Sequence, residues 1–445
     1  MKNFEENEFF KYTGQAIKIF NITGHPIRER LIESLLEIKL AVAMTNGKLG
    51  YLPTDKAEAI ISSTQLILKD LKNYSKFFQI DALSGGAGTS FNMNVNEVIC
   101  FVAKKELEVT VDPLDDVNLH QSTNDVFPTA IKITVLKLLK VLEKNIRLLL
   151  REMHTKEELW RDIVVSGRTQ LQPAVPLTLG KKFSAFAEPL SRDRWRVFKS
   201  RERIKTLNIG GMAIGTGATT PKRFIFEVID QLRNLTELNI TRGENVVDNT
   251  QNMDVFVEIS GIMKANATTL MKIANDIRLL SSSEFGEFRI PENQIGSSIM
   301  PNKINPVISE SVIQGGLKVI ANDMLISQIA SRGELELNVF TPLLAEAVVE
   351  NLEILINLNR NFAEFCIKNL SIQESQIAKN LKDNKSLITF FVPKIGYKKA
   401  KEIFRKAEEQ GKPIEELLIE ESLVTLEEVE DLLKPSNIVS LGYKD

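Results

Sequence analysis

Histidine and cysteine are scarce in this sequence. It contains 3 histidines and 2 cysteines among 445 residues, and no CxxC or HExxH spacing occurs. A zinc site built on histidine and cysteine is therefore not expected, and neither is a disulfide framework. Cys100 and Cys366 each stand in an apolar stretch, so we expect both to be buried, reduced thiols. If the chain is an enzyme, its catalytic base need not be histidine.

The sequence also lacks a surplus of charge and any long apolar run. Lysine plus arginine (56) nearly balances aspartate plus glutamate (58), and no long basic run occurs, which argues against a nucleic-acid or anionic-membrane surface. No uncharged apolar run approaches the ~20 residues of a membrane span. Met1–Tyr12 is charged and lacks the apolar core of ~7–15 residues found in signal peptides. We therefore expect a cytoplasmic protein with small soluble partners.

Helical periodicity dominates the middle of the chain. Apolar residues recur at three- and four-residue steps through 130–153 and 255–282, and no proline stands between Pro306 and Pro342. The periodic positions are Val135, Leu138, Leu142, Ile146, Leu149, Phe256, Ile259, Met263, Leu270, Ile273, Ile277 and Leu280. Such stripes lie on one helix face and need partners. We therefore predict an all-α fold with a bundle of long antiparallel helices and little sheet.

A chain of this length can bury several cores. We predict a mostly helical N-terminal domain at 1–125, a central long-helix bundle at 126–370 and a small helical C-terminal domain at 371–445. Polar, turn-rich segments interrupt the helical pattern at 84–98, 112–130, 166–176 and 295–310.

The first three segments each allow two interpretations. In "SGGAGTSFNMNVNEV", threonine and asparagine would either bind a small polar ligand or cap a helix that starts near Asn94. "QSTND", which precedes Pro128, would either leave helix amides for an anion or form a capping cluster. In "GRTQLQPAVP", Arg168 would either clamp the structure or bind a ligand, and Pro176 would start a helix.

The fourth segment, "IGSSIMPNKINPVISE", is the most specific. It combines the hydroxyls of Ser297 and Ser298 with the fixed positive charge of Lys303, and 2 prolines restrict its backbone. Its composition alone leaves open a functional loop and an ordinary surface loop.

Together the segments resemble the aspartase/fumarase superfamily. Its GSSxMPxKxN pattern is matched in full by "GSSIMPNKIN" (296–305), and "GTSFNMNVNEV", "QSTND" and "GRTQLQ" occur in the family order. The tail "PKIGYKKAKEI" is similar to the family's third domain. The resemblance implies a three-domain, all-α fold whose central helices form a twenty-helix core in a homotetramer. It also implies active sites that are each shared among three subunits.

Within this superfamily, the chain most resembles the branch that deaminates L-aspartate reversibly to fumarate and ammonia. The implied reaction is an anti β-elimination through an aci-carboxylate intermediate. No cofactor and no metal site is expected, and activation by a divalent cation is left open. The alternatives are a fumarate hydratase acting on L-malate, a lyase for a related dicarboxylate, and a non-catalytic paralogue.

The resemblance also implies a role for each matching residue. Ser297 matches the base and Lys303 supports it. Substrate-binding positions are Thr89, Ser122, Thr123, Asn124, Thr169, Gln170, Ser298 and Asn305, with Glu310 in a supporting place. Ser122, Thr123 and Ser298 match the β-carboxylate site. Thr169, Lys303 and Asn305 match the α-carboxylate site, and Thr89, Asn124 and Gln170 surround the amine.

The N-terminal segment departs from the family pattern. The family's Tyr-Gly pair followed by Thr-x-Arg is only echoed by Tyr12, Gly14 and Ala16. Its arginine is missing, and Gln15 or Lys18 stands near that place.

Overall fold

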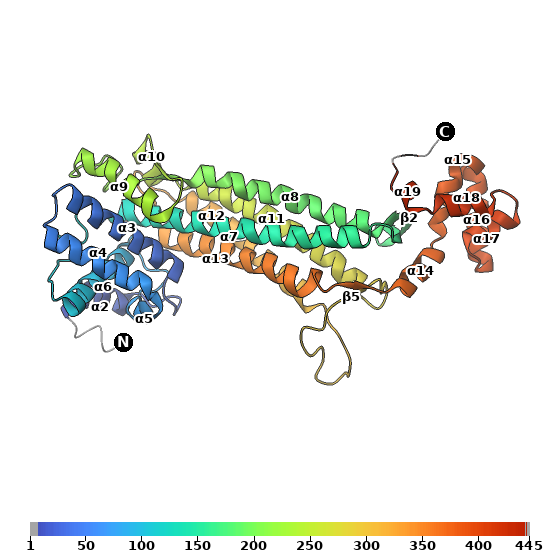
Figure 1. Cartoon of the computed structure of the whole chain (residues 1–445), viewed down its shortest axis with the longest axis horizontal. Helices are drawn as coiled ribbons and strands as arrows, with labels where there is room; N and C mark the ends of the chain where they lie inside the picture. Colours follow the sequence, from blue (N-terminus) through green and yellow to red (C-terminus); the bar gives the residue numbers. More distant parts are fainter. Residues whose placement is uncertain (1–7, 441, 443–445) are drawn as a thin grey trace. The chain divides into compact units, whose positions relative to one another are not determined.

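The computed structural model describes residues 8–440 and 442 and is mostly helical (Figure 1). Residues 1–7, which begin the charged N-terminal stretch, lie outside the described residues. The chain divides into two compact units. The first comprises Met1–Glu143, Trp195–Ala265 and Leu317–Ile356, and the second comprises Lys144–Arg194, Asn266–Gly316 and Asn357–Asp445. The prediction of an all-α fold is confirmed, whereas the division into domains at 125 and 370 stays a prediction.

A cluster of helices forms the N-terminal part of the first unit (Figure 1, blue). They are η1 (Glu8–Phe10), α2 (Lys11–Ile19), α3 (Glu29–Lys48), α4 (Thr54–Lys69), α5 (Leu71–Tyr74), η2 (Ser75–Phe77) and α6 (Thr89–Leu107). α3 packs against α4 and α9 (Lys222–Thr236), and α4 packs against α6. Leu35, Leu36 and Ile38 of α3 are fully buried, so apolar burial holds the cluster together.

Five long helices contribute residues to both units. They are α7 (Thr123–Leu159), α8 (Leu179–Ile204), α11 (Asp254–Leu280), α12 (Val307–Ala330) and α13 (Thr341–Phe362). Every residue of the predicted apolar stripes in α7 and α11 is buried, which confirms the helical periodicity. The proline-free stretch 307–341 is not one helix, because the chain leaves α12 and turns through residues 331–340 before α13 begins.

Buried polar pairs join the long helices within each unit. In the first unit, Asn322 Nδ2 of α12 donates to Asn351 Oδ1 of α13 at 2.9 Å. In the second unit, Asn359 Nδ2 of α13 donates to Asn266 Oδ1 of α11 at 2.9 Å. Buried polar pairs of this kind specify how helices pair, since an amide that lost its partner would be costly.

The sheets are small, as the sequence predicts. In the first unit, β3 (Thr206–Leu207) and β4 (Thr241–Arg242) pair in parallel beside α10 (Val246–Gln251). In the second unit, β1 (Val164–Thr169) and β2 (Gln172–Thr178) form an antiparallel hairpin, and β5 (Phe288–Arg289) pairs with β6 (Ser371–Ile372).

The hairpin corrects the expected start of the following helix. Pro176 lies within β2, and α8 begins three residues later at Leu179. Strand pairing continues as far as Val164 opposite Thr178, so tertiary pairing overrides the preference of proline for a helix start. Thr178 Oγ1 then accepts the Lys181 amide at 3.2 Å, which satisfies an amide in the first turn of α8.

The C-terminal part of the second unit has an apolar core of its own. Its elements are η3 (Ala363–Ile367), α14 (Glu374–Lys382), η4 (Lys385–Phe391), α15 (Val392–Ile395), α16 (Tyr397–Gln410), α17 (Ile414–Glu420), α18 (Leu426–Leu432) and α19 (Pro435–Ile438). Ile403 and Ala407 of α16 meet Leu417 and Leu418 of α17 in this core. Thr425 and Glu428 cap α18 reciprocally, which satisfies two amides at its start.

Two predictions from what the sequence lacks can be checked directly. Cys100 and Cys366 are free and buried, which confirms the expected thiols, and burial raises the pKa of both, that of Cys366 to about 12. Between residues 8 and 440, no helix is long and apolar enough to cross a bilayer.

Candidate active site

Thr89 opens α6 after a sharp turn. Gly86, Ala87 and Gly88 have φ values of 87°, 55° and 94°, a left-handed run that glycine tolerates best. A Cβ at Gly88 would lie 2.5 Å from Cγ of Phe127, so glycine lets the start of α6 pack against α7. Thr89 Oγ1 donates to the carbonyl of Gly86 at 2.7 Å. This hydrogen bond uses the hydroxyl proton of Thr89, and the lone pairs of its Oγ1 can still accept hydrogen bonds.

The asparagines that follow Thr89 are buried. Because α6 already begins at Thr89, the expected capping of a helix start near Asn94 is wrong. The side-chain amides donate instead to other segments of the same unit: Asn92 to Asn118 Oδ1, Asn94 to the carbonyl of Phe77, and Asn96 to the carbonyl of Pro113. These side chains therefore hold α6 in place.

Residues 121–125 cap the start of α7. The Ser122 amide donates to Asp125 Oδ1 at 3.0 Å, and the Asn124 amide donates to Ser122 Oγ at 3.3 Å. This arrangement is a capping cluster, one of the two alternatives for the segment. The Asn124 side chain donates through Nδ2 to the carbonyl of Ala213 at 2.8 Å, so its Oδ1 remains an acceptor.

Asp125, which is absent from the predicted site residues, joins this segment to the loop 208–217. Its Oδ2 accepts the amides of Gly210 and Met212 at 3.1 and 2.9 Å. The side chain is fully buried. Burial raises its pKa to about 7, against the opposing pull of the amides and of the buried ammonium of Lys39. The loop 208–217 is thereby fixed beside the start of α7.

Thr169 and Gln170 stand at the tip of the β1–β2 hairpin. Gln170 and Leu171 have φ values of 51° and 62°, as expected for a two-residue hairpin turn in which both central residues have positive φ. Thr169 pairs with Gln172 across the turn. Thr169 and Gln170 are both exposed, so the hairpin presents them outward.

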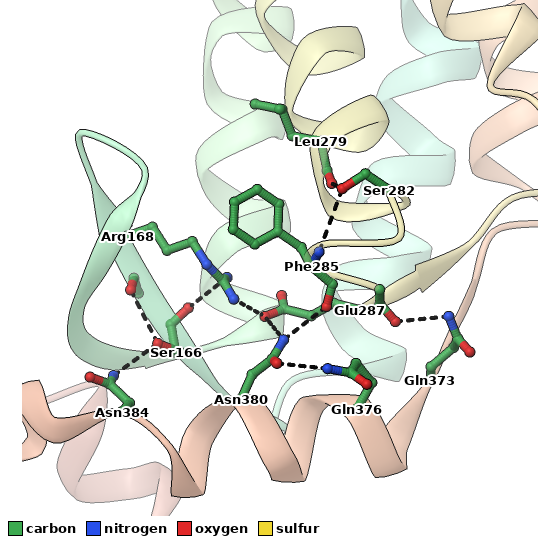
Figure 2. A network of polar contacts seen from close by, with 12 residues as sticks. Ser166, Arg168, Leu279, Ser282, Phe285, Glu287, Gln373, Gln376, Asn380 and Asn384 are labelled. Carbon is green, nitrogen blue, oxygen red and sulfur yellow. Dashed lines mark hydrogen bonds and ion pairs between the residues drawn. The ribbon is translucent and has the colours of Figure 1, made fainter. Parts of the chain in front are cut away.

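Arg168 ties the hairpin to the rest of the second unit (Figure 2). Its Nη2 lies 2.6 Å from Oε1 of Glu287, and its guanidinium lies 4.7 Å from the ring centre of Phe285. Glu287 is 1% exposed, so the pair is largely desolvated, and the clamp interpretation of Arg168 is confirmed. Two asparagines extend the network: Asn380 donates to Glu287 Oε1, and Asn384 donates to Ser166 Oγ.

Residues 290–306 form a mostly exposed loop before α12. Ser297 Oγ accepts hydrogen bonds at 3.2 and 2.9 Å from the amides two and three residues further along the chain. Such amides stabilise negative charge on an oxygen. Asn305 Nδ2 donates to the carbonyl of Gly296 at 2.5 Å. This hydrogen bond joins the two ends of the stretch 296–305.

Close backbone contact also explains the glycine that precedes Ser297. A Cβ at Gly296 would lie 1.6 Å from the carbonyl oxygen of Lys303, so no other residue fits without opening the loop. Ser298 and Lys303 are exposed, and Glu310 is half-buried in the first turn of α12.

The histidines have structural or surface positions. His120 Nδ1 lies 2.8 Å from Asn46 Oδ1, and its ring packs against Tyr51 and Phe224. Burial lowers the pKa of His120. His25 and His154 are exposed. Within the described part of the chain, no group of 3 or more His, Cys, Asp or Glu residues could hold a metal ion.

The predicted site residues therefore fall into separate groups. Within the first unit, Gly88 packs on Phe127 of α7, and this contact brings the start of α6 close to the start of α7. These two helix starts carry Thr89, Ser122, Thr123 and Asn124. Within the second unit, the hairpin tip carries Thr169 and Gln170, and the loop 290–306 with the start of α12 carries Ser297, Ser298, Lys303, Asn305 and Glu310.

Comparisons with known proteins agree with this architecture. A family model described as "Lyase" matches residues 10–321, and one described as "Fumarase C C-terminus" matches residues 387–440. An aspartate ammonia-lyase of Bacillus subtilis is 36% identical over 443 residues, covering 97% of this chain and 92% of the relative.

Solved structures are similar over nearly the whole chain. A fumarate lyase:delta crystallin from Brucella melitensis, in a structure bound to cobalt, has a TM-score of 0.91 and 34% identity over 97% of this chain and 95% of its own. A class II fumarase from Schistosoma mansoni has a TM-score of 0.90 and 30% identity, with the same two coverages of 97% and 95%.

The long-helix bundle and the family matches define an all-α lyase fold. More particularly, the chain belongs to the aspartase/fumarase superfamily.

Proposed function

We propose that this protein catalyses the reversible deamination of L-aspartate to fumarate and ammonia. The amine-binding residues carry the proposal. The hydroxyl proton of Thr89 and an amide proton of Asn124 are both donated to backbone carbonyls, so both side chains offer oxygen acceptors. An ammonium group carries only donors and requires such acceptors, whereas a leaving hydroxyl requires a proton donor. Gln170 offers a further carbonyl oxygen at the hairpin tip.

Ser297 is the base in this reaction. Its Oγ removes a proton from Cβ of L-aspartate, and the electron pair moves into the β-carboxylate to form the aci-carboxylate. A serine alkoxide forms only where negative charge is stabilised strongly. The amides that donate to Ser297 Oγ and the charge of Lys303 supply that stabilisation. The intermediate then breaks its Cα–N bond, and ammonia leaves with the bonding electron pair.

The carboxylates of the substrate need separate partners. Ser122, Thr123 and Ser298 bind the β-carboxylate, and their hydrogen bonds strengthen as it gains charge in the transition state. Lys303, Thr169 and Asn305 fix the α-carboxylate. We assign Glu310, in the first turn of α12, a supporting role as a hydrogen-bond acceptor.

The protein acts as a homotetramer in the proposed mechanism, and each active site gathers its segments from three subunits. The exposed apolar residues of α12 support an association between copies, since Leu317 and Met324, seven residues apart, are 55% and 70% exposed. Gel filtration with light scattering measures this state directly, and a monomer with full activity would contradict it. We place the protein in the cytoplasm, where its free thiols remain reduced. No cofactor is required for the elimination.

The ultraviolet absorbance of fumarate tests the function. Purified protein is given L-aspartate or L-malate, with and without a divalent cation. We expect fumarate to accumulate with L-aspartate. Accumulation with L-malate alone would establish a hydratase. The absence of fumarate with both substrates would contradict the proposed deamination and favour a non-catalytic paralogue or a lyase for a related dicarboxylate. A dependence of the aspartate reaction on the added cation would identify metal activation.

A further inference from the structure

A pocket of about 430 Å³ opens beside the hairpin in the second unit. Residues of the hairpin, of α8 and of the end of α11 line it, together with Phe285 from the chain just beyond α11. Its walls are mainly apolar, formed by Leu177, Phe186, Leu279 and Leu280. A cavity of this size with apolar walls and few polar groups is typical of a small-molecule site.

Lys182 gives this pocket a positive charge that the described residues around it neutralise only in part. Arg168 and Lys182 both face the single carboxylate of Glu287, at 2.6 and 3.9 Å, and the nearer partner is Arg168. At the rim, Lys272 is already paired with Asp276. One positive charge therefore remains in excess among these groups.

The ammonium of Lys182 also has unused hydrogen-bond donors. Its side chain is only 16% exposed. Within the described part of the chain no residue accepts a hydrogen bond from Nζ, because the contact with Glu287 Oε2 at 3.9 Å is too long for one. Burial lowers the pKa of Lys182, since a desolvated ammonium is unfavourable without an anion or acceptor. Oε2 of Glu287 likewise has no hydrogen-bond partner among the described residues.

We propose that this pocket binds a small monocarboxylate with an apolar body, whose carboxylate pairs with Lys182. The excess of one positive charge matches a single negative charge, and the leucine and phenylalanine walls match a hydrocarbon or aromatic body. A second carboxylate would lie against those apolar walls and lose its hydration. The pocket therefore differs in selectivity from a site for dicarboxylates.

The hairpin connects this pocket to Gln170. Gln170 and Leu171 line the pocket at the turn, while Arg168 anchors the same hairpin to Glu287. A bound monocarboxylate consequently contacts the segment that carries Thr169 and Gln170. Binding itself is independent of the deamination proposed above, so the two proposals can fail separately.

Calorimetric titration of the full-length protein with 3-phenylpropionate tests the site. The uncharged 3-phenylpropionamide tests the need for the carboxylate, and succinate tests the need for an apolar body. We expect saturable binding of 3-phenylpropionate and at least tenfold weaker binding of the other two. Equal binding of the amide, or no binding of 3-phenylpropionate up to its solubility limit, would overturn the proposal.

Variants then locate the binding. We expect Lys182→Met to weaken it at least tenfold, and Lys181→Met, which changes an exposed neighbour outside the pocket, to leave it within twofold. Ala185→Trp fills the mouth of the pocket without removing a charge and is expected to abolish binding. Unchanged binding in a folded Lys182→Met or Ala185→Trp protein contradicts the assignment. Displacement of 3-phenylpropionate by fumarate also contradicts the assignment, because the probe would then occupy a dicarboxylate site.

Discussion

The segment 121–125 and the loop 290–306 carry predicted substrate-binding residues in two different physical states. In the first, Asp125 is fully buried and accepts three backbone amides from two segments. In the second, the side-chain hydrogen bonds of Ser297 and Asn305 stay within the loop, and Ser298 and Lys303 are exposed.

This difference separates the residues that position the substrate from the residue that takes its proton. Groups that bind a carboxylate of fixed geometry gain from a rigid, buried support, because less order has to be imposed when the ligand arrives. A base that meets its substrate and releases the product gains from a segment whose movement disturbs no core. We therefore expect changes in 121–125 to affect both folding and activity, and changes in 290–306 to affect activity alone.

The largest expected effect is on turnover. Ser297→Ala removes the proposed base and is expected to lower kcat by about 10³-fold, while the free energy of unfolding changes by less than about 0.5 kcal/mol. Steady-state fumarate production and urea unfolding measure the two quantities. Ser311→Ala, an exposed serine of α12, is the matched control and should retain full turnover. Near-normal turnover of Ser297→Ala would refute the assignment of the base.

The next effect is on stability. Asp125→Asn replaces one of the two carboxylate oxygens that accept three backbone amides by an NH2 donor, and this leaves buried amides without an acceptor. We expect a loss of about 3 kcal/mol in the free energy of unfolding, together with a lower kcat/KM. Urea unfolding at equal protein concentration measures the loss, and Asp115→Asn, at an exposed position, is the control. If both variants unfold at the same urea concentration, the buried network does not support the segment.

A smaller effect is expected at the hairpin tip. Gln170→Ala removes one proposed acceptor near the amine and is expected to lower kcat/KM for L-aspartate by about tenfold, equivalent to about 1.4 kcal/mol. Stability should stay unchanged, because Gln170 is exposed. The neighbouring exposed Gln172→Ala serves as the control. Equal kinetics for the two variants would remove Gln170 from the site.

The smallest effect concerns pH. Lys132 of α7 is buried and donates to the carbonyl of Thr206 at 2.8 Å, and burial lowers its pKa to about 8. Above about pH 8 the unfolded chain still holds this proton while the folded state releases it, so stability rises with pH. The contribution is about 1 kcal/mol between about pH 8 and about pH 9.

Lys132→Met is expected to remove this rise. Urea midpoints across the same pH range measure it, with Lys140→Met on the exposed face of α7 as the control. A rise of unchanged size in Lys132→Met would assign the titration to another group.

Much of the site could be read from local sequence. The pattern "GSSIMPNKIN" identified the loop and its residue types, and the apolar periodicity predicted the buried faces of α7 and α11. Asp125 was missed because its role depends on Gly210 and Met212, more than eighty residues away. The glycine-rich stretch "NIGGMAIGTG" was the available signal, since glycines permit a loop whose amides converge on an acceptor.

Two errors have the same origin. The asparagines after Thr89 read as helix caps because such residues favour caps locally, but long-range contacts with Asn118 and Pro113 decide their positions. Local sequence predicts a helix start at Pro176, but pairing with β1 keeps its segment in a strand.

By itself, the sequence determined the helical class, the buried helix faces, the residue types of the loop and the family resemblance, because these depend on periodicity and short contiguous patterns. Only the tertiary structure decided which carboxylate supports the start of α7, which acceptor oxygens stay unused at Thr89 and Asn124, and that Lys182 faces a pocket. These features arise between residues far apart in the chain, where burial and hydrogen-bond geometry are set by packing rather than by local preference.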